Sequence, residues 1–158
     1  MNALKETSCA FSGNRELPKG KALERLKTDA ENAIMTLIYK GYTDFYAGGA
    51  QGFDMLCELT VLKFRTQGYD VKLHIAAPFE GQDKKWSADN KIIYSHIIKL
   101  ADEVTYASQE EATEAYFIRN RAMVDASSVL ICFQRKNSGG TEYTINYAQK
   151  QGLEIVMI

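Results

Sequence analysis

Residues Asp44–Asp54 have the sequence DFYAGGAQGFD. It starts with a short apolar and aromatic run, continues as a glycine-rich turn at Gly48–Gly52, and leads into an amphipathic segment, Phe53–Thr66. This order predicts a strand, a turn and a helix, because glycine permits positive φ and a close approach to the backbone. A helix after such a turn directs unpaired N–H groups and its positive dipole end toward the turn. The stretch therefore indicates either an anion site, most simply for phosphate, or a tight connection that needs small residues.

Apolar runs and helical periodicities alternate along the whole chain. Strands are expected at 8–12, 44–47, 71–77, 103–106, 128–133 and 154–158. Helices are expected at 22–39, 53–66, 89–100, 110–125 with Ser108 as its cap, and from the glycine turn 138–141 to 150. Short apolar strands separated by helices indicate a parallel sheet that is covered on both faces. We therefore predict a single α/β domain over residues 1–158, with a doubly wound, mainly parallel sheet.

The composition is that of an ordinary globular protein, with 46% hydrophobic and 25% charged residues. Nineteen basic and twenty acidic residues give a net charge of −1, so nucleic acid is a disfavoured partner. Cys9, Cys57 and Cys132 lie in separate apolar runs without metal-ligand spacing, which indicates buried free thiols and neither disulfides nor a metal site. Because Met1–Thr7 is polar and no apolar run reaches about 18 residues, we expect a cytoplasmic protein without a membrane span.

Four polar or glycine-rich segments follow predicted strands. They are SGNR (12–15), GGAQG (48–52), PFEGQ (78–82) and SGGT (138–141). In a doubly wound sheet, ligands bind beyond the carboxyl ends of the strands, where these segments meet. Their convergence predicts a site for a nucleotide or another phosphorylated ligand.

Two kinds of charged residue are candidates for that site. Arg15 directly follows the first strand and can clamp a phosphate, although a solvated surface arginine gives the same pattern. Arg119 and Arg121 are two residues apart on a helix, so we expect only one of them to face the site. Asp54 and Glu142 each lie in the first turn of a helix. Either acid can complement the helix dipole. Asp54 can instead accept a ribose hydroxyl or position a water, and Glu142 can act as a general base near a sugar carbon.

The remaining candidates are aromatic or imidazole side chains. Trp86 can stack on a base, although a lone large aromatic residue in a loop more often serves packing. His74 lies inside a strand and His96 in the middle of a helix, so both are expected to be structural.

Taken together, the motifs resemble the SLOG superfamily of Rossmann-like domains, in particular its small stand-alone bacterial branch similar to YpsA. The resemblance rests on SGNRE (12–16), GGAQGFD (48–54), the P-F-x-x-Q…W-x-x-x-N segment (78–90) and RNRAMVDASSVLICF…SGGTEYTINYA (119–148). It implies a Rossmann-like fold and a site for a nucleotide-derived ligand, such as an NAD or ADP-ribose derivative, bound by the glycine turns.

Some relatives, the LOG phosphoribohydrolases, release a base from nucleoside 5′-monophosphates. They carry an arginine four residues before a methionine, followed by a P-G-G-x-G-T-x-x-E loop. Arg119 stands four residues before Met123, which matches, but the loop here lacks the proline and the x-G insert, and Thr144 occupies the place of the glutamate. Cleavage of an N-glycosidic bond needs a carboxylate, so Glu142 or Asp54 would have to supply it.

Three hypotheses follow. The first is a sensor or regulatory domain that binds a nucleotide-derived ligand, with no cofactor required and no metal. The residues expected to bind are Ser12, Gly13, Arg15, Gly48, Gly49, Ala50, Gln51, Gly52, Asp54, Pro78, Gln82, Trp86, Arg119, Ser138, Gly139, Gly140 and Thr141. The second is a nucleotide N-glycosidase with Arg119, Glu142 and Asp54 as candidate catalytic residues. The third is a DNA-binding accessory protein like the DprA relatives. Self-association into a homo-oligomer is expected from the same resemblance.

Overall fold

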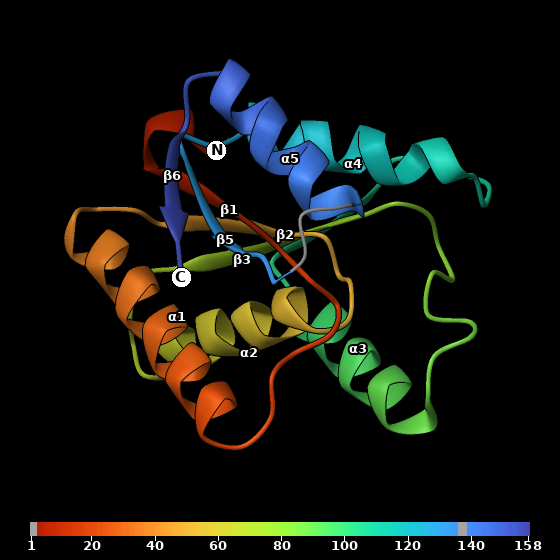
Figure 1. Cartoon of the computed structure of the whole chain (residues 1–158), viewed down its shortest axis with the longest axis horizontal. Coiled ribbons are helices and arrows are strands. Elements are labelled where there is room, and N and C mark those ends of the chain that lie inside the picture. The colour runs from red at the N-terminus through yellow and green to blue at the C-terminus, as the bar shows by residue number, and fades with distance from the viewer. Residues whose placement is uncertain (1–2, 136–138) are drawn as a thin grey trace.

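The computed structural model describes residues 3–135 and 139–158. Within them, one parallel sheet has the strand order β4-β3-β2-β1-β5-β6 (Figure 1). The strands are β1 (Ser8–Gly13), β2 (Asp44–Ala47), β3 (Lys72–Ala77), β4 (Glu103–Tyr106), β5 (Val129–Phe133) and β6 (Glu154–Met157). All five pairings between neighbouring strands are parallel, which confirms the predicted sheet.

Helices cover both faces of the sheet, as predicted. They are α1 (Lys21–Tyr39), α2 (Phe53–Thr66), α3 (Ala88–Leu100), α4 (Thr113–Asp125) and α5 (Gly139–Lys150), with a short 3-10 helix, η1 (Lys5–Thr7). Figure 1 shows α1, α2 and α3 on one face, and α4 and α5 on the other. Among the described residues, no helix has the length and apolar character needed to cross a membrane.

The alternation of side chains along the strands divides the core in two. Phe11, Phe45 and Leu73 point toward α2 and belong to the larger apolar cluster. Ala10 and Leu130 point the other way, toward the smaller cluster under α4 and α5. Because successive strand residues face opposite sides, one apolar run can supply both clusters. The three cysteines are buried with free thiols, as predicted.

The direction of winding reverses between β1 and β5. Strands β1 to β4 extend the sheet toward one edge, and β5 then returns to the other side of β1. The backbone N–H of Asn14 donates to the carbonyl of Phe133 (3.1 Å), so the carboxyl ends of the two strands remain joined. In an open parallel sheet, this reversal is where ligands bind.

Helix α4 begins later than predicted, at Thr113, and Ala112 before it makes no side-chain cap hydrogen bond. The prediction that Ser108 caps this helix is wrong. Its hydroxyl donates to the carbonyl of Glu110 (2.8 Å) and accepts from the N–H of the same residue (3.2 Å), which stabilises a turn. Such local hydrogen bonds of serine compete with helix formation. The other predicted boundaries agree with the structure to within one residue.

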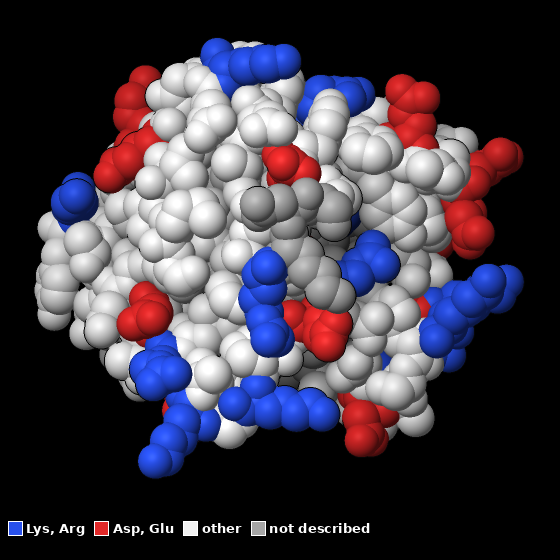
Figure 2. Space-filling view, in the orientation of Figure 1, with Lys and Arg blue, Asp and Glu red and all other residues white. Residues whose placement is uncertain are grey.

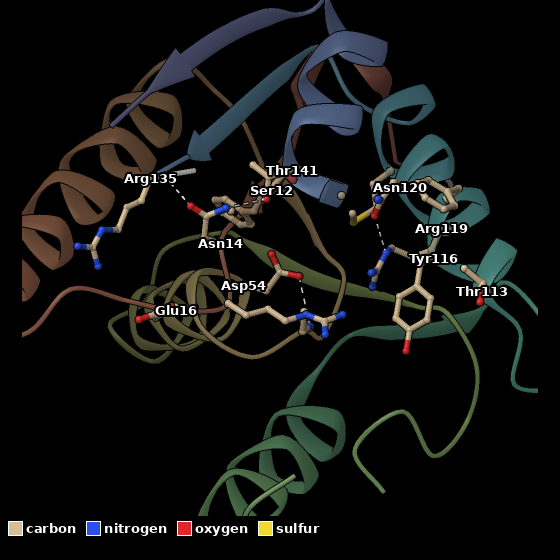
Figure 3. Close-up of a pocket in the computed structure, with 17 residues that line it drawn as sticks. Ser12, Asn14, Glu16, Asp54, Thr113, Tyr116, Arg119, Asn120, Arg135 and Thr141 are labelled. Atoms are coloured by element: carbon tan, nitrogen blue, oxygen red, sulfur yellow. Dashed lines mark hydrogen bonds between the residues drawn. The ribbon is translucent and has the colours of Figure 1, made fainter. Parts of the chain in front are cut away.

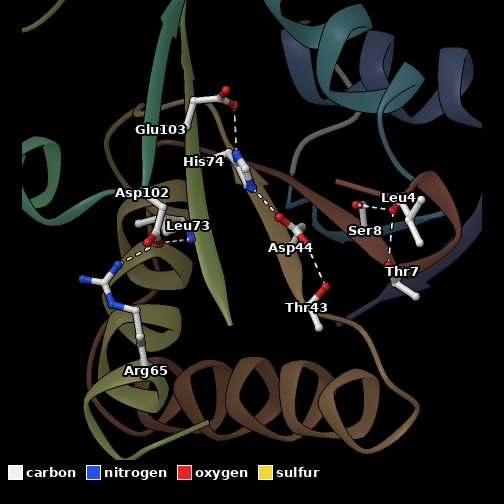
Figure 4. Close-up of polar contacts among 10 residues, drawn as sticks. All are labelled: Leu4, Thr7, Ser8, Thr43, Asp44, Arg65, Leu73, His74, Asp102 and Glu103. Carbon is white, nitrogen blue, oxygen red and sulfur yellow. Dashed lines mark hydrogen bonds and ion pairs between the residues drawn. The ribbon is translucent and has the colours of Figure 1, made fainter. Parts of the chain in front are cut away.

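His74 on β3 lies between carboxylates of the two neighbouring strands (Figure 4). Its Nε2 is 2.6 Å from Asp44 Oδ2, and its Nδ1 is 2.9 Å from Glu103 Oε1. Its ring stacks on Tyr46 with 4.3 Å between the ring centres. This histidine therefore links three strands, which agrees with a structural role, whereas His96 is exposed on α3.

Candidate functional site

A cavity of about 610 Å³ opens at the carboxyl ends of β1 and β5 (Figure 3). The loop after β1, the first turn of α2, one side of α4 and the start of α5 form its wall. The volume is in the range of small-molecule sites. Several predicted binding residues line it: Ser12, Gly13, Arg15, Ala50, Asp54, Arg119, Gly140 and Thr141.

Other predicted residues do not belong to the described lining of this cavity: Gly48, Gly49, Gln51, Gly52, Pro78, Gln82, Trp86, Gly139 and Glu142. Ser138 lies outside the described residues. The part of all these residues in ligand binding stays a prediction.

Further residues line the cavity that the sequence patterns did not single out as ligands: Asn14, Glu16, Thr113, Tyr116, Phe117, Asn120, Met123 and Arg135. Tyr116 lies three residues before Arg119, so helical spacing places both on the same side of α4. Arg135 follows β5 as Arg15 follows β1, so the same strand-end rule could have found it.

Arginines reach the described lining from three different parts of the chain. Arg119 comes from α4 and is buried, whereas Arg15 and Arg135 follow strands and are exposed. The guanidinium carbons of Arg15 and Arg119 lie 5.8 and 5.7 Å from the centre of the Tyr116 ring, within the range of a cation–π contact. Arg121 instead donates to the hydroxyl of Tyr143 (2.8 Å), so Arg119 is the arginine of this pair that faces the cavity.

The buried guanidinium of Arg119 is held in place by backbone and side-chain oxygens. Its Nη1 donates to the carbonyl of Gly48 (2.5 Å) and its Nε to Asn120 Oδ1 (2.7 Å). Burial lowers the pKa of Arg119, and the nearby carboxyl of Asp54 opposes this shift. The arrangement fixes a positive charge at the cavity wall, because an arginine keeps its proton even when its pKa is lowered.

Two acidic side chains of α2 accept hydrogen bonds from the backbone N–H groups of the glycine turn 48–52. Asp54 Oδ2 accepts the N–H groups of Gly48 (3.2 Å) and Ala50 (3.3 Å), and Glu58 Oε2 accepts that of Gly49 (2.9 Å). These N–H groups are the donors that a phosphate in the turn would use. The turn therefore binds carboxyl groups of its own chain, and a phosphate there would have to displace them.

Glu58 is a buried acid that the sequence analysis missed, although its position four residues after Asp54 places both on one face of α2. Its Oε1 has no hydrogen-bond partner among the described residues. Burial raises the pKa of Glu58 well above its ordinary value, and the charge of Asp54 adds to this shift. Burial also raises the pKa of Asp54, while Arg119 lowers it in opposition.

The segment after β3 and the start of α3 contact the glycine turn through hydrogen bonds. Gln82 Nε2 donates to the carbonyls of Gly48 and Gly49 (both 3.3 Å) and to the hydroxyl of Tyr94 (3.0 Å). Trp86 packs edge-on against Tyr94, with 5.1 Å between the ring centres. In the same segment, Asn90 Nδ2 donates to the Gln51 side chain (2.6 Å). These contacts explain the P-F-x-x-Q…W-x-x-x-N motif as the scaffold of the turn.

Asn14 connects the segments that meet at the reversal of the sheet. Its Oδ1 accepts the N–H of Arg135 (2.5 Å), and its Nδ2 donates to Thr141 Oγ1 at the start of α5 (3.4 Å). Its carbonyl accepts the N–H of Phe53 at the start of α2 (3.2 Å). One residue of the SGNRE motif thus contacts both helix starts at the cavity, that of α5 through its side chain and that of α2 through its backbone carbonyl.

Residues 17–157 match the YspA SLOG family, YpsA. The chain belongs to this family. Among its relatives is the uncharacterized SPbeta prophage-derived protein YoqJ of Bacillus subtilis (strain 168), 30% identical over 145 residues that cover 84% of this chain and 85% of YoqJ. A UPF0398 protein of Bacillus cereus (strain B4264) is 23% identical over 133 residues, covering 82% of this chain and 72% of that protein. The predicted resemblance to the YpsA-like branch is confirmed.

Two solved structures of DNA processing protein A (DprA) share the fold of this SLOG chain. The Streptococcus pneumoniae protein has a TM-score of 0.70 and 19% identity, covering 97% of this chain but 50% of DprA. The Helicobacter pylori protein, solved for its single-stranded DNA binding mode, has a TM-score of 0.67 and 17% identity, covering 97% of this chain and 65% of DprA. The chain therefore spans less than two thirds of each DprA, and at these identities the likeness shows the fold alone.

Proposed function

We propose that this SLOG domain binds a nucleotide or nucleotide-derived ligand, of the NAD or ADP-ribose kind, as a sensor or regulatory domain. The observation that carries the proposal is the cavity at the reversal of the sheet, which Arg15, Arg119 and Arg135 approach from different elements. A ligand with two phosphates suits several separate arginines better than a single anion does, because each guanidinium can bind one phosphate through two N–H groups.

The parts of such a ligand correspond to different walls of the cavity. Arg15 and Arg135 are exposed and can adjust to the phosphates, while Gly140 and Thr141 present the positive end of α5. Tyr116 and Phe117 on α4 offer aromatic surfaces for a base. This division assigns recognition of charge to the segments after β1 and β5, the start of α5 and Arg119, and recognition of the base to the aromatic residues of α4.

The net charge of −1 and the charge distribution on the face seen in Figure 2 favour a small ligand over DNA. Figure 2 shows acidic and basic side chains intermixed on the viewed face, without a continuous basic track. A nucleic-acid backbone would need such a track of clustered lysine and arginine. We therefore keep the DNA-binding hypothesis below the two nucleotide hypotheses.

The second candidate function is nucleotide N-glycosidase, and the position of Asp54 favours it. Its carboxyl lines the cavity together with Arg119, and burial raises its pKa, which suits a group that donates a proton to a leaving base. Of the two predicted catalytic carboxyls, Glu142 is not in the described lining, so this candidate depends on Asp54.

Thermal unfolding and calorimetry with AMP, ADP-ribose and NAD test the proposal. A ligand that binds the native state raises the Tm in a concentration-dependent way. The variant Arg135→Ala should weaken binding about tenfold, because it removes a charged hydrogen bond to phosphate. Arg25→Ala is the matched control, since Arg25 is exposed on α1 and lines neither this cavity nor the groove beside it.

The bound ligand separates the two candidates. Recovery of the intact ligand supports the sensor, whereas release of a free base that Asp54→Asn abolishes supports the N-glycosidase. No shift with any nucleotide, or equal affinity for both arginine variants, would contradict the proposed site. Sedimentation of the same protein tests the prediction of a homo-oligomer.

A further inference from the structure

A second cavity, a groove of about 590 Å³, lies between α1 and α2. Its lining has an apolar part formed by Leu17, Leu23, Met55, Leu56 and Leu59. The side chains of Gln51 and Asn90, joined by a hydrogen bond of 2.6 Å, add a polar part. An apolar groove with a few polar groups is the usual composition of a ligand site.

The groove adjoins the first cavity at Arg15, which lines both. The glycine turn is divided in the same way, because Ala50 lines the first cavity whereas Gln51 and Gly52 line the groove. A Cβ on Gly52 would overlap the carbonyl oxygen of Arg15, so the loop after β1 rests directly on the turn. The boundary between the two cavities is therefore this loop, with the exposed Arg15 on it.

We propose that the cavity and the groove form one extended site for a pyrophosphate-linked dinucleotide. One nucleoside occupies the cavity, the other occupies the groove, and Arg15 binds the phosphates between them. The inference rests on the proposed function and specifies the ligand class: a nucleotide with a second ring system beyond its pyrophosphate.

The chemistry of the groove suits the second nucleoside. The leucines and Met55 offer apolar and thioether contacts to a flat ring. The amides of Gln51 and Asn90 can hydrogen-bond the edge of a base. Lys27 pairs with Glu24, and Lys63 pairs with Glu31, which also lines the groove. With Arg15, the basic side chains of the described lining outnumber the acidic one, which suits a phosphorylated ligand. A mononucleotide in the cavity would not reach these groups.

A series of AMP, ADP and diadenosine diphosphate tests the inference by isothermal titration calorimetry. On the unmodified protein we expect diadenosine diphosphate to bind at least about tenfold more tightly than ADP, because only it reaches the groove. The variant Leu59→Glu places a charge in the groove and should remove this gain while leaving the affinity for AMP unchanged. The matched control is Leu100→Glu, since Leu59 and Leu100 are 41% and 40% exposed on helices and Leu100 lines neither cavity.

Each outcome decides between the two proposals. A gain that Leu59→Glu abolishes and Leu100→Glu preserves supports the extended site. Equal binding of ADP and diadenosine diphosphate overturns it while the nucleotide site stands, and so does a gain that survives Leu59→Glu. If none of the three compounds binds, the extended site fails, and the proposed function fails with it when ADP-ribose and NAD do not bind either.

Discussion

The two glycine turns of this SLOG domain resemble each other in sequence but have different surroundings in the fold. At 48–52, a Cβ on Gly48 would overlap the guanidinium of Arg119, and one on Gly49 would come within 2.8 Å of Gln82 Nε2. At the start of α5, a Cβ on Gly139 would meet nothing within 4 Å, and one on Gly140 would lie 3.7 Å from Asn120 Nδ2. A side chain at Gly48 or Gly49 would therefore meet packed protein atoms, whereas there is space for one at Gly139 or Gly140.

The hydrogen bonds of the first turn show what its packing achieves. Its N–H groups are taken by Asp54 and Glu58, and its carbonyls by Arg119 and Gln82. Glycines in a turn can therefore serve either of two purposes: they leave space for a ligand, or they allow other parts of the protein to pack against the backbone. In this chain the first turn positions Arg119 at the cavity wall and contributes Ala50 to the lining, while the second contributes Gly140 and Thr141.

Adding one methyl group to each turn should change the free energy of unfolding in opposite directions. Gly52→Ala should lower the free energy of unfolding by about 3 kcal/mol, because Gly52 has a φ of 81° and its Cβ would overlap the Arg15 carbonyl. Gly140→Ala should raise it by about 0.5 kcal/mol, because alanine favours the helix and the space is available. Urea unfolding measures both, and equal effects would contradict the contrast between the turns.

The acids that close the first turn make a smaller contribution, which depends on pH. Because burial raises the pKa values of Glu58 and Asp54, the folded state holds their protons more tightly than the unfolded chain does. Their stabilisation is complete below the unfolded pKa and is lost as the pH rises through the folded pKa. From about pH 5 upward, past the ordinary pKa of a glutamate, the free energy of unfolding should therefore fall.

Glu58→Gln isolates this contribution, because glutamine can still accept the N–H of Gly49 but carries no titrating group. Thermal unfolding between about pH 5 and pH 8 should show a shallower fall for this variant than for the unmodified chain. Glu154→Gln, which changes an exposed carboxyl on β6, should keep the unmodified slope. Parallel slopes for all three proteins would show that Glu58 does not hold a proton more tightly in the fold.

The sequence could predict the fold and the edge of the sheet where the cavity lies, because both depend on local periodicity and on the order of the elements. It could not show that the side chains of Gln82 and Arg119 both donate hydrogen bonds to the carbonyl of Gly48. These residues are 34 and 71 positions away from Gly48 in the sequence, and the contacts form only when the helices pack on the sheet. Glu58 was missed for a similar reason. From the sequence alone, an acidic residue inside a helix is expected to lie at the surface. Its burial becomes evident only from the folded position of the turn whose N–H group it accepts.

The smallest effect concerns the acids at the starts of the two helices that follow the turns. Asp54 accepts two N–H groups of its turn, whereas Glu142 lies in the first turn of α5 and outside the described lining of the cavity. We expect Glu142→Gln to lower the free energy of unfolding by about 0.3 kcal/mol, because only a favourable interaction with the helix dipole is lost. Titration with ADP-ribose should give the same affinity before and after the change. A loss of binding or of base release in Glu142→Gln, with Asp54→Asn unaffected, would contradict this expectation. It would identify Glu142, the other candidate from the sequence, as the functional carboxyl.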